Sequence, residues 1–208
     1  MRPAAHQNAL STAIRALAAE RHPACLLDTQ AAFLFENKAW DRRAIEGGQD
    51  PSTLGGALIG TSWLVSVAGE EARRRRADLF ERALRARAPR RAVTQVGEWN
   101  TPSTAALLST RLEPVLVNGG DPIAISVVHT VVRERPIAEV YDVVDRPAGS
   151  YRVEGGAIVQ CSCCGRVQDP EQLDCWEFVP ALLRAPKPVT HVICDLCAAL
   201  HYGPDHHS

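Results

Sequence analysis

The chain has 208 residues, of which 46% are apolar and 23% charged, and its formal net charge at pH 7 is −1. This balance is typical of a soluble globular protein, and it excludes the strong overall field of a basic nucleic-acid or membrane-surface binder. No apolar run approaches the roughly 18 residues of a membrane-spanning helix, and the N-terminal segment lacks the uninterrupted apolar stretch of a secretory signal. We therefore expect a cytoplasmic protein without membrane contact, with one ordinary domain and a small second unit.

The start of the chain predicts a flanking helix followed by a β-hairpin. Apolar residues from Leu10 to Ala18 recur at the spacing of one helix face, and His22-Pro23 ends the pattern. Two short apolar runs, 24–27 and 31–35, then lie on either side of Asp28-Thr29-Gln30, a sequence that favours a turn.

The middle of the chain predicts two helices and then three strands. The helices span about 38–45 and 70–88, and the second begins with two glutamates, which the helix dipole favours at that end. The strands are expected over 92–96, 105–117 and 123–132. Asn118-Gly119-Gly120-Asp121 joins the last two and favours a hairpin, because glycine accepts positive φ.

This order of elements resembles the PAS sensor fold, a five-stranded antiparallel sheet with helices over one face. The resemblance covers about residues 22–135, and three local motifs carry it: Leu27-Asp28 leading into Phe35–Trp40, Leu58-Ile59-Gly60, and Arg111–Val115. It implies an α+β fold, a sensing role, and an interior that can hold a small molecule, a flavin or haem.

Six of the seven cysteines fall between positions 161 and 197, and four of them form two C-x-x-C pairs. Cys161 and Cys164 make the first pair, Cys194 and Cys197 the second, and 29 residues separate them. Each pair presents two thiolates to one ion, and two pairs complete the tetrahedral four-sulfur shell that zinc prefers. We expect zinc at these four cysteines. Iron is the other metal that such thiolates select, and buried cysteine pairs or a redox disulfide are the alternatives without metal.

The same segment resembles a zinc-ribbon-like module at the C-terminus of bacterial sensor and response-regulator proteins. Val159–Asp169 is similar to that module's Ile-Cys-x-x-Cys-Lys-x-Ile-Arg-Asp, and Thr190–Cys197 to its Ser-His-Gly-Ile-Cys-Pro-x-Cys, with Trp176 between them. The resemblance covers about 157–203 and implies an accessory module without catalysis. This chain departs from the pattern at three positions that are not ligands: Gly165, Val192 and Asp195.

Two further cysteines lie among the four. Cys163 stands inside the first pair and Cys175 precedes Trp176. Each is either a small packed side chain or a redox thiol, because a thiol beside a metal has a lowered pKa. His191 is either a spare ligand or contact of this site, or a packed or solvent-facing histidine.

Four side chains are candidates for lining a ligand pocket in the PAS-like unit: Trp40, Trp63, Trp99 and His129. Aromatics at such positions also form ordinary core, and a strand histidine faces either side of its sheet. In the haem-binding members of the PAS family the ligand histidine lies on the long helix, and here 70–88 contains none. The blue-light members place a reactive cysteine on an earlier helix, and 58–69 contains none. Both cofactors are therefore disfavoured in their usual form.

Nine arginines crowd positions 73–91, opposed by Asp78 and Glu81. A solvated helix face explains such a band, and contact with a phosphate backbone or an acidic partner is the alternative. No nucleophile elbow, phosphate-binding glycine loop or HExxH motif occurs, so we expect no enzyme.

These observations predict four segments: a flanking helix at 1–21, a PAS-like domain at 22–135, a helical linker at 136–157 and a zinc module at 158–203. The predicted function is that of a bacterial signalling or regulatory protein, a homodimer whose ligand or redox sensor is coupled to a zinc module that engages a protein partner. The alternatives are a nucleic-acid-binding regulator that uses the zinc module and the arginine band, and a thiol–zinc redox switch.

Overall fold

The computed structural model describes residues 2–50, 54–86, 92–183 and 188–203, and the chain divides into two compact units. The first unit comprises Met1–Ser66, Arg74–Gly97 and Leu107–Val132. The second comprises Val67–Arg73, Glu98–Ala106 and Arg133–Ser208. No helix within the described ranges has the length and hydropathy needed to span a bilayer.

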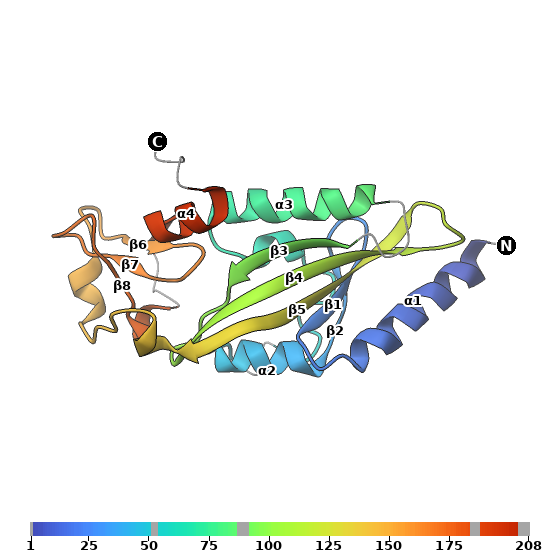
Figure 1. Cartoon of the computed structure of the whole chain (residues 1–208), viewed down its shortest axis with the longest axis horizontal. Coiled ribbons are helices and arrows are strands. Elements are labelled where there is room, and N and C mark those ends of the chain that lie inside the picture. The colour runs from blue at the N-terminus through green and yellow to red at the C-terminus, as the bar shows by residue number, and fades with distance from the viewer. Residues whose placement is uncertain (1, 51–53, 87–91, 184–187, 204–208) are drawn as a thin grey trace. The chain divides into compact units, whose positions relative to one another are not determined.

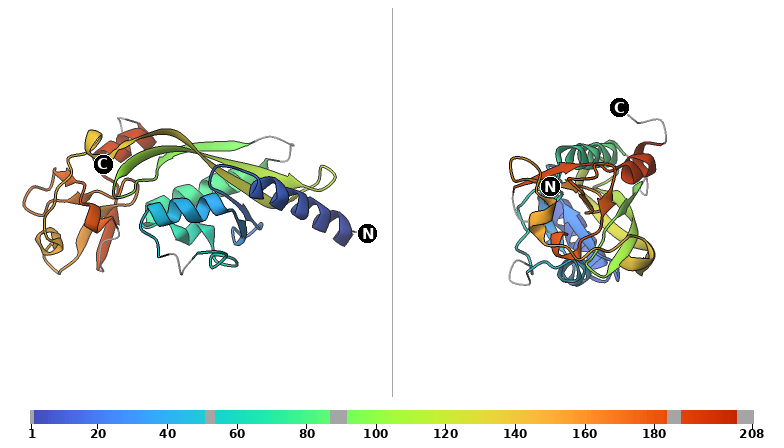
Figure 2. Two further views of the ribbon diagram at one scale, coloured as in Figure 1. Left: turned by 90° about the horizontal axis from the view of Figure 1, so that it is seen from below. Right: turned by 90° about the vertical axis from the view of Figure 1, so that its left-hand side faces the viewer.

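The predicted five-stranded antiparallel sheet is confirmed, with strand order β2-β1-β5-β4-β3 (Figure 1). Its strands are β1 (Ala24–Leu27), β2 (Phe33–Glu36), β3 (Val93–Glu98), β4 (Thr104–Leu116) and β5 (Pro122–Pro136). Cys25 on β1, which lies between β2 and the central β5, is opposite Glu36 on one side and Val127 on the other. The β4–β5 turn takes the left-handed backbone that its sequence favours, with φ of 53° at Asn118 and 70° at Gly119. Figure 2 shows the twist of the long β4 and β5 from two further directions.

Helices α2 (Lys38–Glu46) and α3 (Glu70–Arg85), with the 3-10 turn η2 (Trp63–Ser66), pack on one face of this sheet. Trp40 from α2, Trp63 from η2 and Phe80 from α3 are each less than 10% exposed. They pack against strand residues that include Phe33 and Ile125. Burying side chains of this size stabilises the fold by about 1.5–3 kcal/mol each.

Helix α1 (Arg2–Ala18) packs on other residues of the same sheet. Leu17 is buried there with Leu26 and Ala124, and Leu10 and Ile14 are partly buried. The apolar stripe of α1 is therefore covered in part by the sheet of its own chain.

The second unit is a small four-stranded sheet with one helix. It contains β6 (Ile158–Cys161), β7 (Val167–Gln168), β8 (Trp176–Glu177), β9 (Val189–Val192) and α4 (Asp195–Tyr202). The strand order is β8-β7-β6-β9, and β6 runs parallel to β9. Its main apolar core contains five buried side chains: Tyr151, Ile158, Val167, Val179 and Leu182.

The segment expected as a helical linker, 136–157, lies within this second unit and holds no α-helix. It forms two single 3-10 turns, η3 (Ile137–Glu139) and η4 (Ala148–Tyr151). Ile137 is buried with Phe178, and Tyr151 belongs to the main core. The apolar side chains whose spacing predicted a helix therefore pack into the second unit from a segment without α-helix.

Candidate metal centre

The four cysteines of the two C-x-x-C pairs come together in the second unit. The sulfurs of Cys161, Cys164, Cys194 and Cys197 lie within 4.8 Å of one another, and all four residues are buried. The distance between the sulfurs of Cys164 and Cys194 is 3.7 Å. A tetrahedron with Zn–S bonds of about 2.3 Å has edges of about 3.8 Å. The cluster therefore has the size and the soft donors that suit one such ion.

The parallel pairing of β6 and β9 explains why cysteines 30 or more residues apart meet. Cys161 is the last residue of β6, opposite Val192 at the end of β9, so the chain leaves both strands at the same edge of the sheet. Cys194 follows β9 by two residues and precedes α4, whose first turn carries Cys197. Side chains three apart at a helix start share one face, which brings the second sulfur back beside the first.

The first pair is closed by a tight turn that requires glycine. The Gly165 amide donates to the Cys161 carbonyl oxygen at 3.1 Å, and the Cys161 amide donates to the Arg166 carbonyl oxygen at 2.8 Å. Gly165 has φ of +79°, and a Cβ placed on it would lie 2.5 Å from Cδ1 of Leu183. The departure from the resembling module at this position therefore has a local reason, because another side chain would be strained and crowded.

The two turns are joined by hydrogen bonds from backbone amides. The Cys194 amide donates to the sulfur of Cys161 at 3.4 Å. The Ser162 amide donates to the Val192 carbonyl oxygen at 2.8 Å. These bonds hold the pairs in one arrangement before any metal is considered.

A buried polar network surrounds the cluster. Arg166, only 8% exposed, donates from Nε to the sulfur of Cys164 at 3.4 Å and from Nη2 to that of Cys194 at 3.1 Å. Its guanidinium lies over the ring of Tyr141, 5.1 Å from the centroid, and the Tyr141 hydroxyl donates to Glu98 at 2.7 Å.

Two amide side chains satisfy carbonyl groups of the first turn. Asn100 donates to the Cys164 carbonyl oxygen at 2.9 Å, and Gln160 donates to that of Gly165 at 3.0 Å. No sequence motif marks these two residues as part of the site. The position of Arg166, two residues after Cys164, is a usable local signal. Asn100 precedes Cys164 by 64 residues, and nothing local marks it.

The sulfurs share protons unevenly. Hydrogen bonds from Cys163, and then from the other cysteines of the cluster, lower the pKa of Cys161. Hydrogen bonding to Cys161 raises the pKa of Cys197. Hydrogen bonding within the cluster thus moves the pKa of two of its thiols in opposite directions. A metal ion bound here would displace the thiol protons, with all four sulfurs as ligands.

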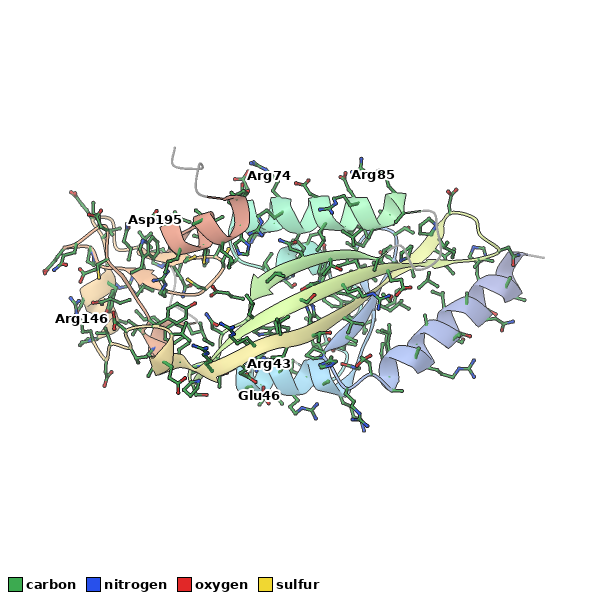
Figure 3. All side chains as sticks on the ribbon, in the orientation of Figure 1. Arg43, Glu46, Arg74, Arg85, Arg146 and Asp195 are labelled. Carbon is green, nitrogen blue, oxygen red and sulfur yellow. The ribbon has the colours of Figure 1, made fainter. Side chains whose placement is uncertain are left out.

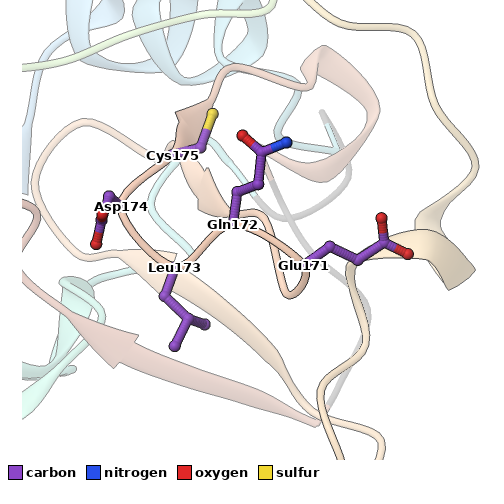
Figure 4. Close-up of a pocket in the computed structure, with 5 residues that line it drawn as sticks. All are labelled: Glu171, Gln172, Leu173, Asp174 and Cys175. Atoms are coloured by element: carbon purple, nitrogen blue, oxygen red, sulfur yellow. The ribbon is translucent and has the colours of Figure 1, made fainter.

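The two candidate redox thiols lie in different surroundings. Cys163 is half-buried and packs against the four-cysteine cluster. Cys175 ends a surface loop that lines an open hollow, formed by 171–175 (Figure 4). Desolvation, and then the nearby carboxylates of Glu177 and Asp169, raise the pKa of the Cys175 thiol, which disfavours a reactive thiolate. His191 lies on β9 outside the four-sulfur group.

The candidate pocket residues are only partly brought together. Trp40 and Trp63 share the core of the first unit, and the ring of Trp40 lies 5.3 Å from that of His129. His129 is buried, and its Nδ1 hydrogen-bonds with Thr110 at 2.8 Å. Burial and then the charge of Arg76 lower the pKa of His129 to about 3, so its ring is neutral. Trp99 belongs to the second unit, and the pocket itself stays a prediction.

The arginine band does not form one uniform surface. Arg76 donates to the Trp63 carbonyl oxygen at 3.0 Å and to the Ser66 hydroxyl at 2.7 Å, and its guanidinium lies 4.4 Å from the Trp63 ring centroid. Arg74 and Arg85 point away from the sheet (Figure 3), and Arg85 pairs with Glu81 at 3.1 Å. The last three arginines of the band lie outside the described residues: Arg87, Arg90 and Arg91.

No family model and no curated protein matches this chain. Among solved structures, the PAS domain from Bordetella pertussis BvgS is similar at 17% identity and a TM-score of 0.46, covering 64% of this chain and 91% of that one. The Rhodobacter sphaeroides LOV protein is similar at 15% identity and 0.45, over 61% and 68% of the two chains. The PAS domain of the fruit-fly ELK potassium channel is similar at 9% identity and 0.43, over 59% and 96%. The PAS-like description of the first unit rests on its own strand order and its helix-covered face.

Proposed function

We propose that this chain is a signalling or regulatory protein in which a PAS-like sensor unit is combined with a structural zinc module that engages a protein partner. The observation that carries the proposal is the convergence of four buried cysteine sulfurs within 4.8 Å. Cys161, Cys164, Cys194 and Cys197 would hold the ion, whose contribution is to stabilise the fold of this unit.

A structural role suits the site better than a catalytic one. Catalytic zinc keeps one coordination position open for water or substrate, whereas four protein thiolates fill a tetrahedral shell. Each of the four cysteines is at most 2% exposed. The main apolar core of this unit is small, with five buried side chains, so a metal would add folding free energy to it. We therefore propose no catalytic activity.

The sensing role is proposed for the first unit. Its interior combines aromatic residues with a neutral histidine, His129, and the guanidinium of Arg76 beside Trp63. Such polar groups within an apolar core support a small-molecule ligand or a redox state as the input. Leu196 and Leu200 on α4, 63% and 51% exposed, support a protein partner for the zinc module.

Metal analysis together with a visible absorption spectrum of the purified protein tests this proposal. We expect one zinc per chain and no iron. Cys161→Ser and Cys197→Ser should each lose the metal, together with the hydrogen-exchange protection of 158–203, while the amides of β1, β2 and α2 stay protected. Cys175→Ser, the matched control outside the cluster, should keep both. Stoichiometric iron, or metal retained by a Cys194→Ala/Cys197→Ala double variant, would contradict the proposal.

Cys163 supports a second candidate function, a thiol–zinc redox switch, because it packs against the four-cysteine cluster and lowers the pKa of Cys161. A peroxide would take two electrons from the two thiols, which would form one disulfide as the peroxide is reduced to water, and zinc would leave. Cys163→Ser should then release zinc several times more slowly in peroxide than Cys175→Ser does. Equal rates in the two variants would exclude this switch.

A further inference from the structure

The buried guanidinium of Arg166 lies against the four-cysteine cluster. The guanidinium of Arg166 donates to one sulfur of each pair, Cys164 at 3.4 Å and Cys194 at 3.1 Å. The other two sulfurs, those of Cys161 and Cys197, receive no hydrogen bond from it among the described contacts. Arg166 therefore divides the four cysteines into two that it contacts and two that it does not.

The charge of the proposed site explains why a cation is useful there. Four thiolates and one Zn²⁺ carry a net charge of −2, and burying this charge without compensation is costly. One guanidinium reduces the sum to −1. Its N–H groups also draw electron density from the sulfurs that accept from them, as charge-assisted hydrogen bonds do. Sulfur of lower electron density is a weaker nucleophile.

The surrounding network keeps this cation directed at sulfur. The Arg166 side chain rests on the ring of Tyr141, whose hydroxyl is bonded to Glu98. Asn100 donates both to Glu98 and to the carbonyl oxygen of Cys164. Within the described part of the chain, no carboxylate pairs directly with Arg166, so its N–H groups are left for the two sulfurs.

We propose that Arg166 is a positioning residue of the metal centre, which neutralises and shields Cys164 and Cys194 and so sets how readily the metal-bound thiolates react. This inference rests on the proposed metal site. It goes beyond that site because it predicts that four cysteines of identical chemistry differ in how fast their sulfurs react.

Cobalt(II), bound in place of zinc, provides the test. Arg166→Met removes the charge and the donors, and Arg166→Gln removes the charge but keeps one N–H donor group on a shorter side chain. Arg166→Lys keeps the charge but cannot donate to two sulfurs from one planar group. Arg146→Met is the matched control, since Arg146 pairs with Asp169 and Glu177 and, among the described contacts, donates to none of the four cluster sulfurs. The readouts are the thiolate-to-cobalt charge-transfer band, and the rate of iodoacetamide modification of each cysteine by mass spectrometry.

In the wild-type cobalt protein we expect Cys164 and Cys194 to be modified after Cys161 and Cys197. Arg166→Met should shift the charge-transfer band to longer wavelength and accelerate modification of Cys164 and Cys194 by about tenfold, which corresponds to loss of one charged hydrogen bond. Arg166→Lys should recover part of both effects, and Arg146→Met should match the wild type.

An unchanged band in Arg166→Met, with an unchanged order of modification, would overturn the inference while leaving the metal site intact. If the Arg166 variants fail to bind cobalt, the order in which the four cysteines of the wild-type protein are modified still tests the inference. Modification of Cys164 and Cys194 before Cys161 and Cys197 would overturn the inference. Failure of the wild-type protein to bind cobalt would instead remove the proposed metal function.

Discussion

The ring of Tyr141 stacks on that of Phe178, with centroids 5.7 Å apart and planes inclined by 9°. Backbone bonds support the pair: the Phe178 amide donates to the Asp142 carbonyl oxygen at 3.2 Å, and the Val144 amide donates to that of Phe178 at 3.0 Å. The segment that follows β5 therefore packs as part of the second unit. A movement of this segment would disturb the same packing that supports Arg166, because Arg166 lies over Tyr141.

Phe178→Ala tests the importance of this packing. Removing a fully buried phenylalanine costs about 3–5 kcal/mol in the free energy of unfolding. We expect the second unit to lose that stability and to lose metal at lower chelator concentration. Leu173→Ala, at a leucine that is 62% exposed in the same unit, should change stability by less than about 0.5 kcal/mol. Equal chelator resistance of the two variants would show that the stack is not a supporting contact.

The sequence predicted the local elements well because their signals are local. Apolar periodicity located the helices and strands, and the glycine-containing turn at Asn118 adopts the backbone that it favours. The spacing of Cys161, Cys164, Cys194 and Cys197 identified the cluster, since a C-x-x-C pair carries its own geometry.

The remaining parts of the site depend on contacts that no short window of sequence records. Asn100 reaches Cys164 across 64 positions, and Glu98 reaches Tyr141 across 43. The apolar spacing of 137–144 suggested an α-helix. The segment instead begins with a 3-10 turn, and its side chains Ile137 and Tyr141 pack against Phe178. Trp99 was grouped with Trp40 by residue type alone, and the fold separates them into different units.

A second prediction concerns Asn37, which connects three segments of the first unit. Its side-chain oxygen accepts from the amides of Ala24 and Trp40, at 3.0 and 2.9 Å. Its amide nitrogen donates to carbonyl oxygens at the end of α1 and in the turn after it, including that of His22 at 2.9 Å. Asn37 is only 3% exposed, so Asn37→Ala would leave buried partners unsatisfied.

We expect Asn37→Ala to lower the free energy of unfolding of this unit by about 3 kcal/mol, the combined cost of a lost helix cap and an unpaired buried group. The measurement is denaturant unfolding monitored by tryptophan fluorescence. Asn8→Ala, at an exposed position of α1, is the matched control and should unfold like the wild type. A cost below about 1 kcal/mol for Asn37→Ala would contradict this account.

A third prediction follows from the pKa of about 3 at His129. The unfolded chain binds a proton at this residue below about pH 6.5, and the folded chain does so only near pH 3. Between these values the unfolded state holds more protons. Stability therefore falls by up to about 1.4 kcal/mol for each pH unit of acidification.

His129→Gln should reduce the slope of unfolding free energy against pH, between pH 6.5 and pH 4, by the amount that corresponds to about one bound proton. The glutamine amide can still hydrogen-bond with Thr110. The measurement is the unfolding free energy of the wild type and of the variant at each pH in this range. The effects of the other titrating groups cancel in the difference between the two. Arg76, the charge that acts on His129, stays in place in both proteins. His6→Gln, on α1, is the control. Parallel curves for His129→Gln and the wild type would show that His129 titrates normally in the fold.

The last prediction concerns self-association through α1. Leu17 is buried against the sheet, whereas Leu10 and Ile14 are only partly covered by it. A second copy of the chain that packs along this part of α1 would bury the remaining apolar surface, so we expect a dimer. Deleting residues 1–21, the simplest test suggested by the sequence, would also uncover Leu26 and Ala124 on the sheet and destabilise the unit.

Leu10→Arg is the sharper test, because it places a charge in the contact while Leu17 keeps its position on the sheet. We expect sedimentation equilibrium to show the dimer dissociation constant rising by tenfold or more, the result of burying an unpaired charge at an interface. Ser11→Arg adds the same charge at an exposed position of the same helix and should dimerise like the wild type. A wild-type chain that stays monomeric at all concentrations, or equal dissociation constants for the two variants, would mean that the partly covered stripe of α1 serves only the fold of its own chain.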